Sequence, residues 1–140
     1  MQGESIHKFQ DQKRYFLVTE LCNGGELFDK ITILKIKQKK LTDKDQLANV
    51  GKELEYLEDK AFTNDPEVNV LVEQLQEINE ASWDIENGKR KCEADKSFSS
   101  KFVKLARDVY IKNDDRAKIK KMINIITKSG IVEEKDYTKY

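Results

Sequence analysis

The strongest constraint on the fold is residues 102–128, whose apolar side chains recur with the period of an α-helix. Steps of three and four residues place them on a single stripe that must be covered by a partner. The stripe consists of Phe102, Leu105, Val109, Ile119, Ile123 and Ile126. Asn113 and Arg116 interrupt it, beside Asp114 and Asp115. Because a buried guanidinium is costly unless it is paired, this polar band is either the rim of the core or the wall of a site.

Three more amphipathic segments precede this stretch, and we expect helices at about residues 25–41, 42–60 and 65–92. Thr42 followed by Asp45 resembles a capping box, which predicts the start of the second segment. Asp65 followed by Pro66 predicts the start of the third, because proline is favoured at the first helical position after a cap. Gly88 weakens the third helix and indicates a bend or a close helix crossing there.

Four amphipathic helices with short connections predict an all-α fold, either a four-helix antiparallel bundle or a pair of long helical hairpins. The β-branched and aromatic run at residues 15–19 is followed by an Asn-Gly-Gly turn, which predicts one short strand in an N-terminal extended segment. We therefore divide the chain into a leader, residues 1–24, and a helical domain, residues 25–140. A long helix that outruns its partners favours a homodimer with coiled-coil pairing.

Charge and cysteine content exclude several classes of function. The 26 basic residues balance the 26 acidic residues, so no global field attracts nucleic acid or an anionic membrane. Apolar runs are only a few residues long and no signal segment opens the chain, so we expect a cytoplasmic protein with no membrane span. The two cysteines are far apart and His7 is the single histidine, so we expect no metal site, no cofactor and no catalytic nucleophile.

Residues 25–137 resemble a bacterial family of small helical proteins of unknown function. The resemblance lies in GELFDKITILKIK at 25–37, LANVGKELEYLE at 47–58, INEASWDIENGKR at 78–90, FVKLARDVYIKNDDRAKIKKMIN at 102–124 and GIVEEKDY at 130–137. It implies no activity. It implies only that the polar and aromatic positions characteristic of the family are Glu26, Asp29, Lys30, Asn79, Trp83, Asp84, Asn113, Asp115 and Arg116.

Residues 9–31, FQDQKRYFLVTELCNGGELFDKI, resemble the hinge of a calcium-dependent protein kinase. This resemblance implies an ATP site in which the backbone at Glu20 and Cys22 holds adenine and Glu26 faces ribose or substrate. The sequence contains no glycine-rich phosphate loop, strand lysine, HRD motif or DFG motif, all of which phosphoryl transfer by a kinase requires. On this hypothesis the segment belongs to a kinase fragment that is inactive alone.

The polar family positions fall on three helices that we expect to touch, so we predict that they converge on one cluster. Arg116 offers a planar fork to a carboxylate or phosphate, which favours a pocket for a small anionic ligand. The alternative is an internal salt-bridge network that fixes helix register, and structural ion pairs are commoner than sites. Trp83 is typical of a core anchor. The leading hypothesis is non-catalytic binding or assembly, ahead of an anionic-metabolite binder or enzyme and of the kinase fragment.

Overall fold

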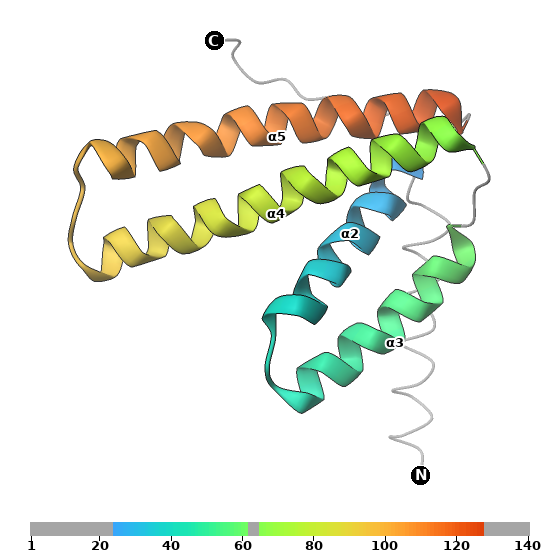
Figure 1. Ribbon diagram of the computed structural model, residues 1–140, viewed down its shortest axis with the longest axis horizontal. Coiled ribbons are helices and arrows are strands. Elements are labelled where there is room, and N and C mark those ends of the chain that lie inside the picture. The colour runs from blue at the N-terminus through green and yellow to red at the C-terminus, as the bar shows by residue number, and fades with distance from the viewer. Residues whose placement is uncertain (1–23, 62–64, 128–140) are drawn as a thin grey trace, which may run out of the picture.

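The part of the chain that the computed structural model describes, residues 24–61 and 65–127, is built from α-helices (Figure 1). The helices are α2 (Gly24–Lys40), α3 (Lys44–Lys60), α4 (Pro66–Ala94) and α5 (Ser100–Ile126). All four predicted helices are thereby confirmed, and the described residues contain no strand. The predicted strand at residues 15–19 and the hinge-like residues Glu20 and Cys22 lie outside the described residues.

The helices form two antiparallel hairpins, a short one of α2 and α3 and a long one of α4 and α5 (Figure 1). Helix α2 packs against α3, α4 and α5, whereas α4 and α5 pack mainly against each other. The short hairpin meets the long one at the end where α4 begins and α5 ends. Of the two predicted arrangements, paired hairpins therefore describes the molecule better than four equivalent helices around one axis.

Local sequence explains where two of the helices begin. Asp43 is the N-cap of α3, and its carboxylate accepts a hydrogen bond from the backbone N–H of Gln46 at 2.9 Å. The predicted cap at Thr42 is therefore wrong by one residue, because the carboxylate of Asp43 accepts the hydrogen bond from the first turn that a cap residue provides for. Asp65 caps α4 and Pro66 occupies its first turn, as predicted.

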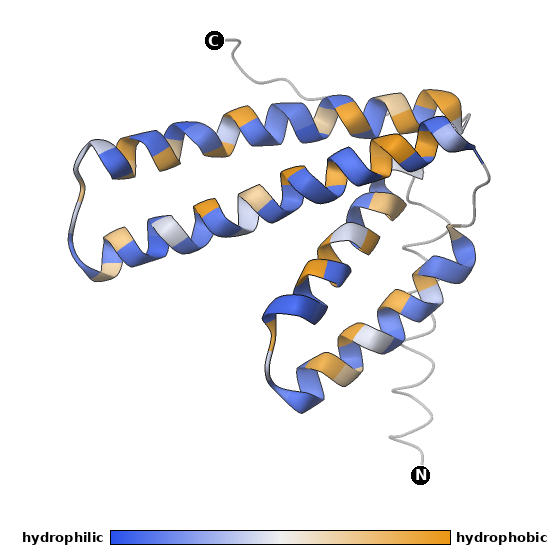
Figure 2. Ribbon diagram, in the orientation of Figure 1, coloured by the Kyte–Doolittle hydropathy of each residue, from blue (hydrophilic) through white to orange (hydrophobic). Residues whose placement is uncertain are grey.

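The hydrophobic core lies where the two hairpins meet, a region we call the base: α2, α3, residues 66–80 of α4 and residues 116–126 of α5. Its buried apolar members are Leu27, Phe28, Ile31, Leu34, Val50, Leu54, Leu57, Val68, Leu71, Leu75, Ile119 and Ile123. Figure 2 shows apolar residues gathered on the ends of α4 and α5 that meet α2. The predicted stripe of α5 is thus divided, because Ile119 and Ile123 are buried whereas Leu105 and Val109 are half-buried.

The remainder of the long hairpin, residues 81–115, projects beyond the base and is here called the arm (Figure 1). Within it, Ile85 and Cys92 are buried although they lie outside the core cluster. A Cβ added at Gly88 would lie 3.1 Å from Cδ1 of Leu105, so α4 and α5 approach closely there. The predicted close crossing at Gly88 is confirmed, and α4 remains one continuous helix through it.

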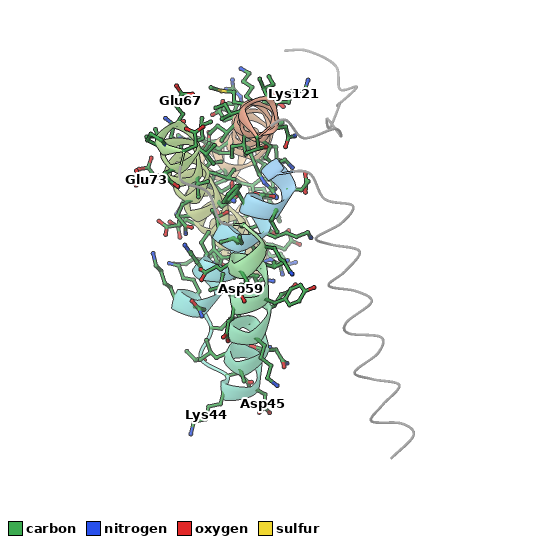
Figure 3. All side chains as sticks on the ribbon, turned by 90° about the vertical axis from the view of Figure 1, so that its right-hand side faces the viewer. Lys44, Asp45, Asp59, Glu67, Glu73 and Lys121 are labelled. Carbon is green, nitrogen blue, oxygen red and sulfur yellow. The ribbon has the colours of Figure 1, made fainter. Side chains whose placement is uncertain are left out.

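Viewed along the long hairpin, the base is layered. Helices α4 and α5 lie side by side, α2 lies beneath α5, and α3 lies furthest from α4 and α5 (Figure 3). Lys44 and Asp45 mark the far tip of α3, and Lys121 lies on the side of α5 that faces away from α2. Helix α2 is therefore the element that every other part of the base contacts, and the polar residues it carries toward α4 and α5 are inside the molecule.

Candidate functional site

The centre of the candidate site is Asp29, a carboxylate that is only 2% exposed in the middle of the base. Its Oδ1 accepts hydrogen bonds from Nδ2 of Asn79 at 2.9 Å and from Nε of Arg116 at 2.8 Å. Its Oδ2 accepts from Nη2 of the same arginine, which completes a bidentate ion pair. Burying a carboxylate costs several kcal/mol, and this pairing offsets that cost.

Thr32 joins the same cluster one turn along α2. Its hydroxyl donates to the backbone carbonyl of Asp29 at 2.7 Å and accepts from Nδ2 of Asn79 at 2.8 Å. The amide of Asn79 therefore uses both of its hydrogens on α2, one on the carboxylate and one on the hydroxyl. Helices α2 and α4 are held in one register by this bridge.

Two more contacts continue the polar interface between α2 and α5 toward the start of α2. Lys120, which is buried, forms an ion pair with Glu26. The backbone N–H of Gly25 donates to Oδ1 of Asn124 at 2.7 Å. Together with the ion pair between Asp29 and Arg116, these contacts form what we call the polar ladder, defined as Gly25–Asn124, Glu26–Lys120 and Asp29–Arg116.

The ladder follows directly from helix geometry. Arg116, Lys120 and Asn124 are four residues apart, so they stand one above another on one face of α5. Because α2 and α5 run antiparallel, the same face meets residues 29, 26 and 25 of α2 in reverse order. Each of these three contacts, or rungs, thus joins α2 and α5 at a defined position along the helix axes. Together they set the register of the two helices.

Gly25 permits the two helix backbones to touch. A Cβ at this position would lie 2.5 Å from the backbone oxygen of Lys120 and 2.9 Å from its Cα. These neighbours are main-chain atoms that cannot rotate away, so any larger residue would force α2 and α5 apart. The close approach in turn allows the short side chain of Asn124 to reach the backbone of α2.

Charge is balanced within the ladder, since two acidic side chains face two basic ones. Asp29 and Lys120 are the buried partners, with side chains 3% and 7% exposed, while those of Arg116 and Glu26 are each 30% exposed. Among the described residues, Nδ2 of Asn124 is a buried side-chain donor without a hydrogen-bond partner. The two ion pairs therefore each have one partner turned inward and one at or near the molecular surface, whereas the contact between Gly25 and Asn124 is buried on both sides.

The predicted convergence of three helices is present in part. Asp29, Asn79 and Arg116 meet, and Glu26 enters the ladder through Lys120. The other predicted site residues do not join it by any hydrogen bond or ion pair within the described ranges: they are Lys30, Trp83, Asn113 and Asp115, which are half-buried, and Asp84, which is exposed. They were grouped because the family resemblance marks them as characteristic polar and aromatic positions. Lys30 and Asp115 directly follow or precede Asp29 and Arg116, so helix geometry turns their side chains to another face. Trp83 and Asn113 lie one helical turn further into the arm than Asn79 and Arg116.

Four members of the cluster were not predicted: Gly25, Thr32, Lys120 and Asn124. The signal for two of them was present, since Lys120 and Asn124 continue the series from Arg116 in four-residue steps. Thr32 likewise follows Asp29 by three residues on the same face of α2. The backbone contact at Gly25 carries no such signal, because it depends on how two distant helices cross.

The chemistry available in this cluster is that of a closed hydrogen-bonded network. No group of three or more His, Cys, Asp or Glu side chains able to hold a metal ion occurs in residues 24–61 and 65–127. Surface hollows occur elsewhere, one of about 550 Å³ along the arm part of α5 and one of about 530 Å³ between α2 and α3. Over the same described ranges, none of the helices is both long enough and apolar enough to span a bilayer.

These features define a small helical protein made of two antiparallel hairpins that a buried polar ladder holds together. The model of DUF6165, a family of unknown function, matches residues 17–140, so the chain belongs to that family. The match includes residues 17–24, which the sequence division above places in the leader. No curated protein and no solved structure matches the chain. None of these findings links residues 9–31 to a calcium-dependent protein kinase.

Proposed function

We propose that this chain is a non-catalytic binding or assembly module, in which the base is a rigid support and the arm presents the contact surface. The observation that carries this proposal is the composition of the arm. Val103, Tyr110 and Ile111 are 53%, 45% and 36% exposed on α5, beyond the reach of α2 and α3. Apolar and aromatic side chains gathered on one exposed element are typical of a surface that binds another macromolecule.

The polar ladder supports a structural role for the residues that resembled a ligand site. Arg116 already binds a carboxylate in the bidentate geometry that it would offer to an anionic metabolite. A ligand in that position would displace Asp29 and leave a charge unpaired inside the core, at a cost of several kcal/mol. The alternative of a small anionic-ligand binder or enzyme therefore requires the ladder to open.

The alternative of an inactive ATP-binding kinase fragment depends on Glu20 and Cys22, which lie outside the described residues. Its one described residue, Glu26, forms an ion pair with Lys120 on α5. A carboxylate held in this way would have to leave its lysine to face a ribose or a substrate, which makes this alternative the weaker of the two.

Site-specific photo-crosslinking in cells tests the proposal. A benzophenone amino acid in place of Tyr110 on the arm should give a discrete adduct with a macromolecule after irradiation. The matched control replaces Glu55, which is exposed on α3, and should give none. Absence of any adduct from position 110, in a variant whose circular dichroism is unchanged, would contradict the proposal. Equal adducts from both positions would also count against it.

A thermal-shift screen separates this proposal from the ligand-binding alternative. Anionic metabolites should leave the melting temperature of the wild-type chain unchanged, because Asp29 already occupies the guanidinium fork of Arg116. A metabolite that raises the melting temperature of the wild type but not of Arg116→Lys would favour the alternative, since lysine cannot form the same bidentate contact.

A further inference from the structure

We propose that the partner of the arm is a second copy of this chain, which packs antiparallel along the outer side of α5. This inference rests on the proposed function and names the partner and the surface. The surface, here called the outer stripe, is formed by Val103, Arg107, Ile111, Asp114, Lys118, Met122 and Ile125. It lies opposite the side of α5 that carries the core residues Ile119 and Ile123.

The outer stripe repeats every eleven residues. Val103, Asp114 and Ile125 are spaced by eleven, and so are Ile111 and Met122. Because eleven residues make three turns at about 3.67 residues per turn, such a series runs nearly straight along a helix. The stripe therefore extends for about 33 Å at 1.5 Å per residue, over both the arm and the base.

The apolar members of this stripe are unusually open to solvent. Met122 is 49% exposed and continues the line of Ile111, and Ile125 is 73% exposed and continues the line of Val103. Single exposed apolar residues are ordinary on protein surfaces. Here Val103 and Ile125 lie on one line along α5, and Ile111 and Met122 lie on a second line beside it. Four exposed apolar residues on one side of one helix indicate a surface that is covered in use.

The charges of the stripe select a second copy in one orientation. When two α5 helices pack antiparallel about an axis beside residue 116, Asp114 faces Lys118 of the partner subunit, and Lys118 faces Asp114 of the partner subunit. The same register brings Ile111 to within one residue of the level of Met122 of the partner subunit. A parallel pairing would instead place Asp114 and Lys118 each against an identical charge, which is unfavourable. The sequence of α5 is therefore complementary to itself in the antiparallel sense.

Shape supports the same register. The hollow of about 550 Å³ on the arm is lined by Ser100, Val103, Lys104, Arg107, Asp108 and Ile111. In the antiparallel pairing this hollow faces the end of α5 where Met122 and Ile125 protrude from the base. Each copy therefore offers a hollow on its arm and protruding apolar side chains on its base. The long stem of Arg107 can line the contact while its guanidinium stays in water.

Sedimentation velocity of the full chain, measured over a concentration series, tests this inference. The wild type should sediment as a dimer at micromolar concentration. Asp114→Lys and Lys118→Asp should each raise the dimer dissociation constant by about tenfold or more, because each places like charges across the axis. The double variant that carries both changes should recover the dimer, since the reciprocal pairs form again with the signs exchanged. Glu55→Lys on α3 makes the same charge change away from the stripe and should leave the dimer intact.

Several results would overturn the inference. They are a chain that is monomeric at all concentrations, a dimer that Asp114→Lys does not weaken, and a double variant that stays as weak as the single ones. Dimerisation only after removal of residues 128–140 would show that the chain's own C-terminal segment occupies the stripe, and would also overturn it. A monomeric chain whose position 110 crosslinks to a different macromolecule would refute this inference and leave the proposed function standing. A monomeric chain without adducts would refute both.

Discussion

The base and the arm use the same two long helices in opposite ways. In the base, charged and polar side chains such as Asp29 and Lys120 are buried and paired, and they hold α2 to α5. In the arm, apolar side chains such as Val103 and Tyr110 are exposed. The difference teaches that the amphipathic pattern of α4 and α5 does not by itself determine which residues are covered. The short hairpin determines it, because it covers only one end of the long one.

The contrast predicts that the base is far more sensitive to loss of a charge than the arm. Asp29→Ala removes the acceptor of Arg116 and Asn79 and should lower the free energy of unfolding by about 3–5 kcal/mol, measured by urea denaturation. Asp84→Ala, at an exposed position of α4 in the arm, should change it by less than about 0.5 kcal/mol. Equal losses from the two variants would break the comparison.

Glycine substitutions sharpen the comparison at the level of the backbone. Gly25→Ala places a Cβ against main-chain atoms of Lys120 and should destabilise the protein by about 1–3 kcal/mol, the usual cost of overpacking. Gly51→Ala on α3, where a Cβ meets nothing within 4 Å, is the matched control. It should instead stabilise the protein by about 1 kcal/mol, through helix propensity alone. Stabilisation by Gly25→Ala would show that the two helices can separate at no cost.

The third glycine tests the arm. A Cβ at Gly88 approaches Cδ1 of Leu105 at 3.1 Å, and a leucine side chain can move by a few tenths of an ångström. The gain in helix propensity, about 1 kcal/mol, should therefore roughly offset the contact, and thermal unfolding of Gly88→Ala should stay close to that of the wild type. A loss as large as that of Gly25→Ala would mean that the arm is packed as rigidly as the base.

The smallest effect is expected at the edge of the base, where Lys39 on α2 binds Glu80 on α4 at 2.9 Å. The hydrogen bond from Lys39 is the main cause that lowers the pKa of Glu80 below its ordinary value of 4.5. A lowered pKa stabilises the folded state above pH 4.5, and that contribution is lost as the pH falls below it. The melting temperature of Lys39→Ala should be slightly below that of the wild type at pH 7, and the difference should disappear as the pH falls through the lowered pKa of Glu80. Lys44→Ala, at the tip of α3, should show no such pH dependence.

Much of the fold can be predicted from local sequence patterns. The four helices follow from apolar periodicity, and the start of α4 follows from Asp65 and Pro66. The meeting of Asp29, Asn79 and Arg116 was predicted from the polar positions characteristic of the family, which fall on three helices expected to touch. The helix predictions succeed because their cause lies within a few residues of the position concerned.

Other parts of the site depend on contacts between distant segments. Lys120 and Asn124 directly follow the core residues Ile119 and Ile123. A lysine in such a position is predicted to be solvent-exposed unless an acidic partner is known to face it. The sequence predicts that Gly24 and Gly25 form a turn after a strand, whereas Gly25 lies inside α2 at a helix crossing. The outer stripe is equally hard to find, because apolar residues on two opposite faces of α5 obscure its period.

The contact at Gly25 has a mechanical consequence. The main chain of α2 at Gly25 approaches the main chain of α5 at Lys120 so closely that no side-chain atom of residue 25 would fit between them. A tilt of the long hairpin should then move the first turn of α2 together with α5. Force applied at the tip of the hairpin would thus reach the first turn of α2.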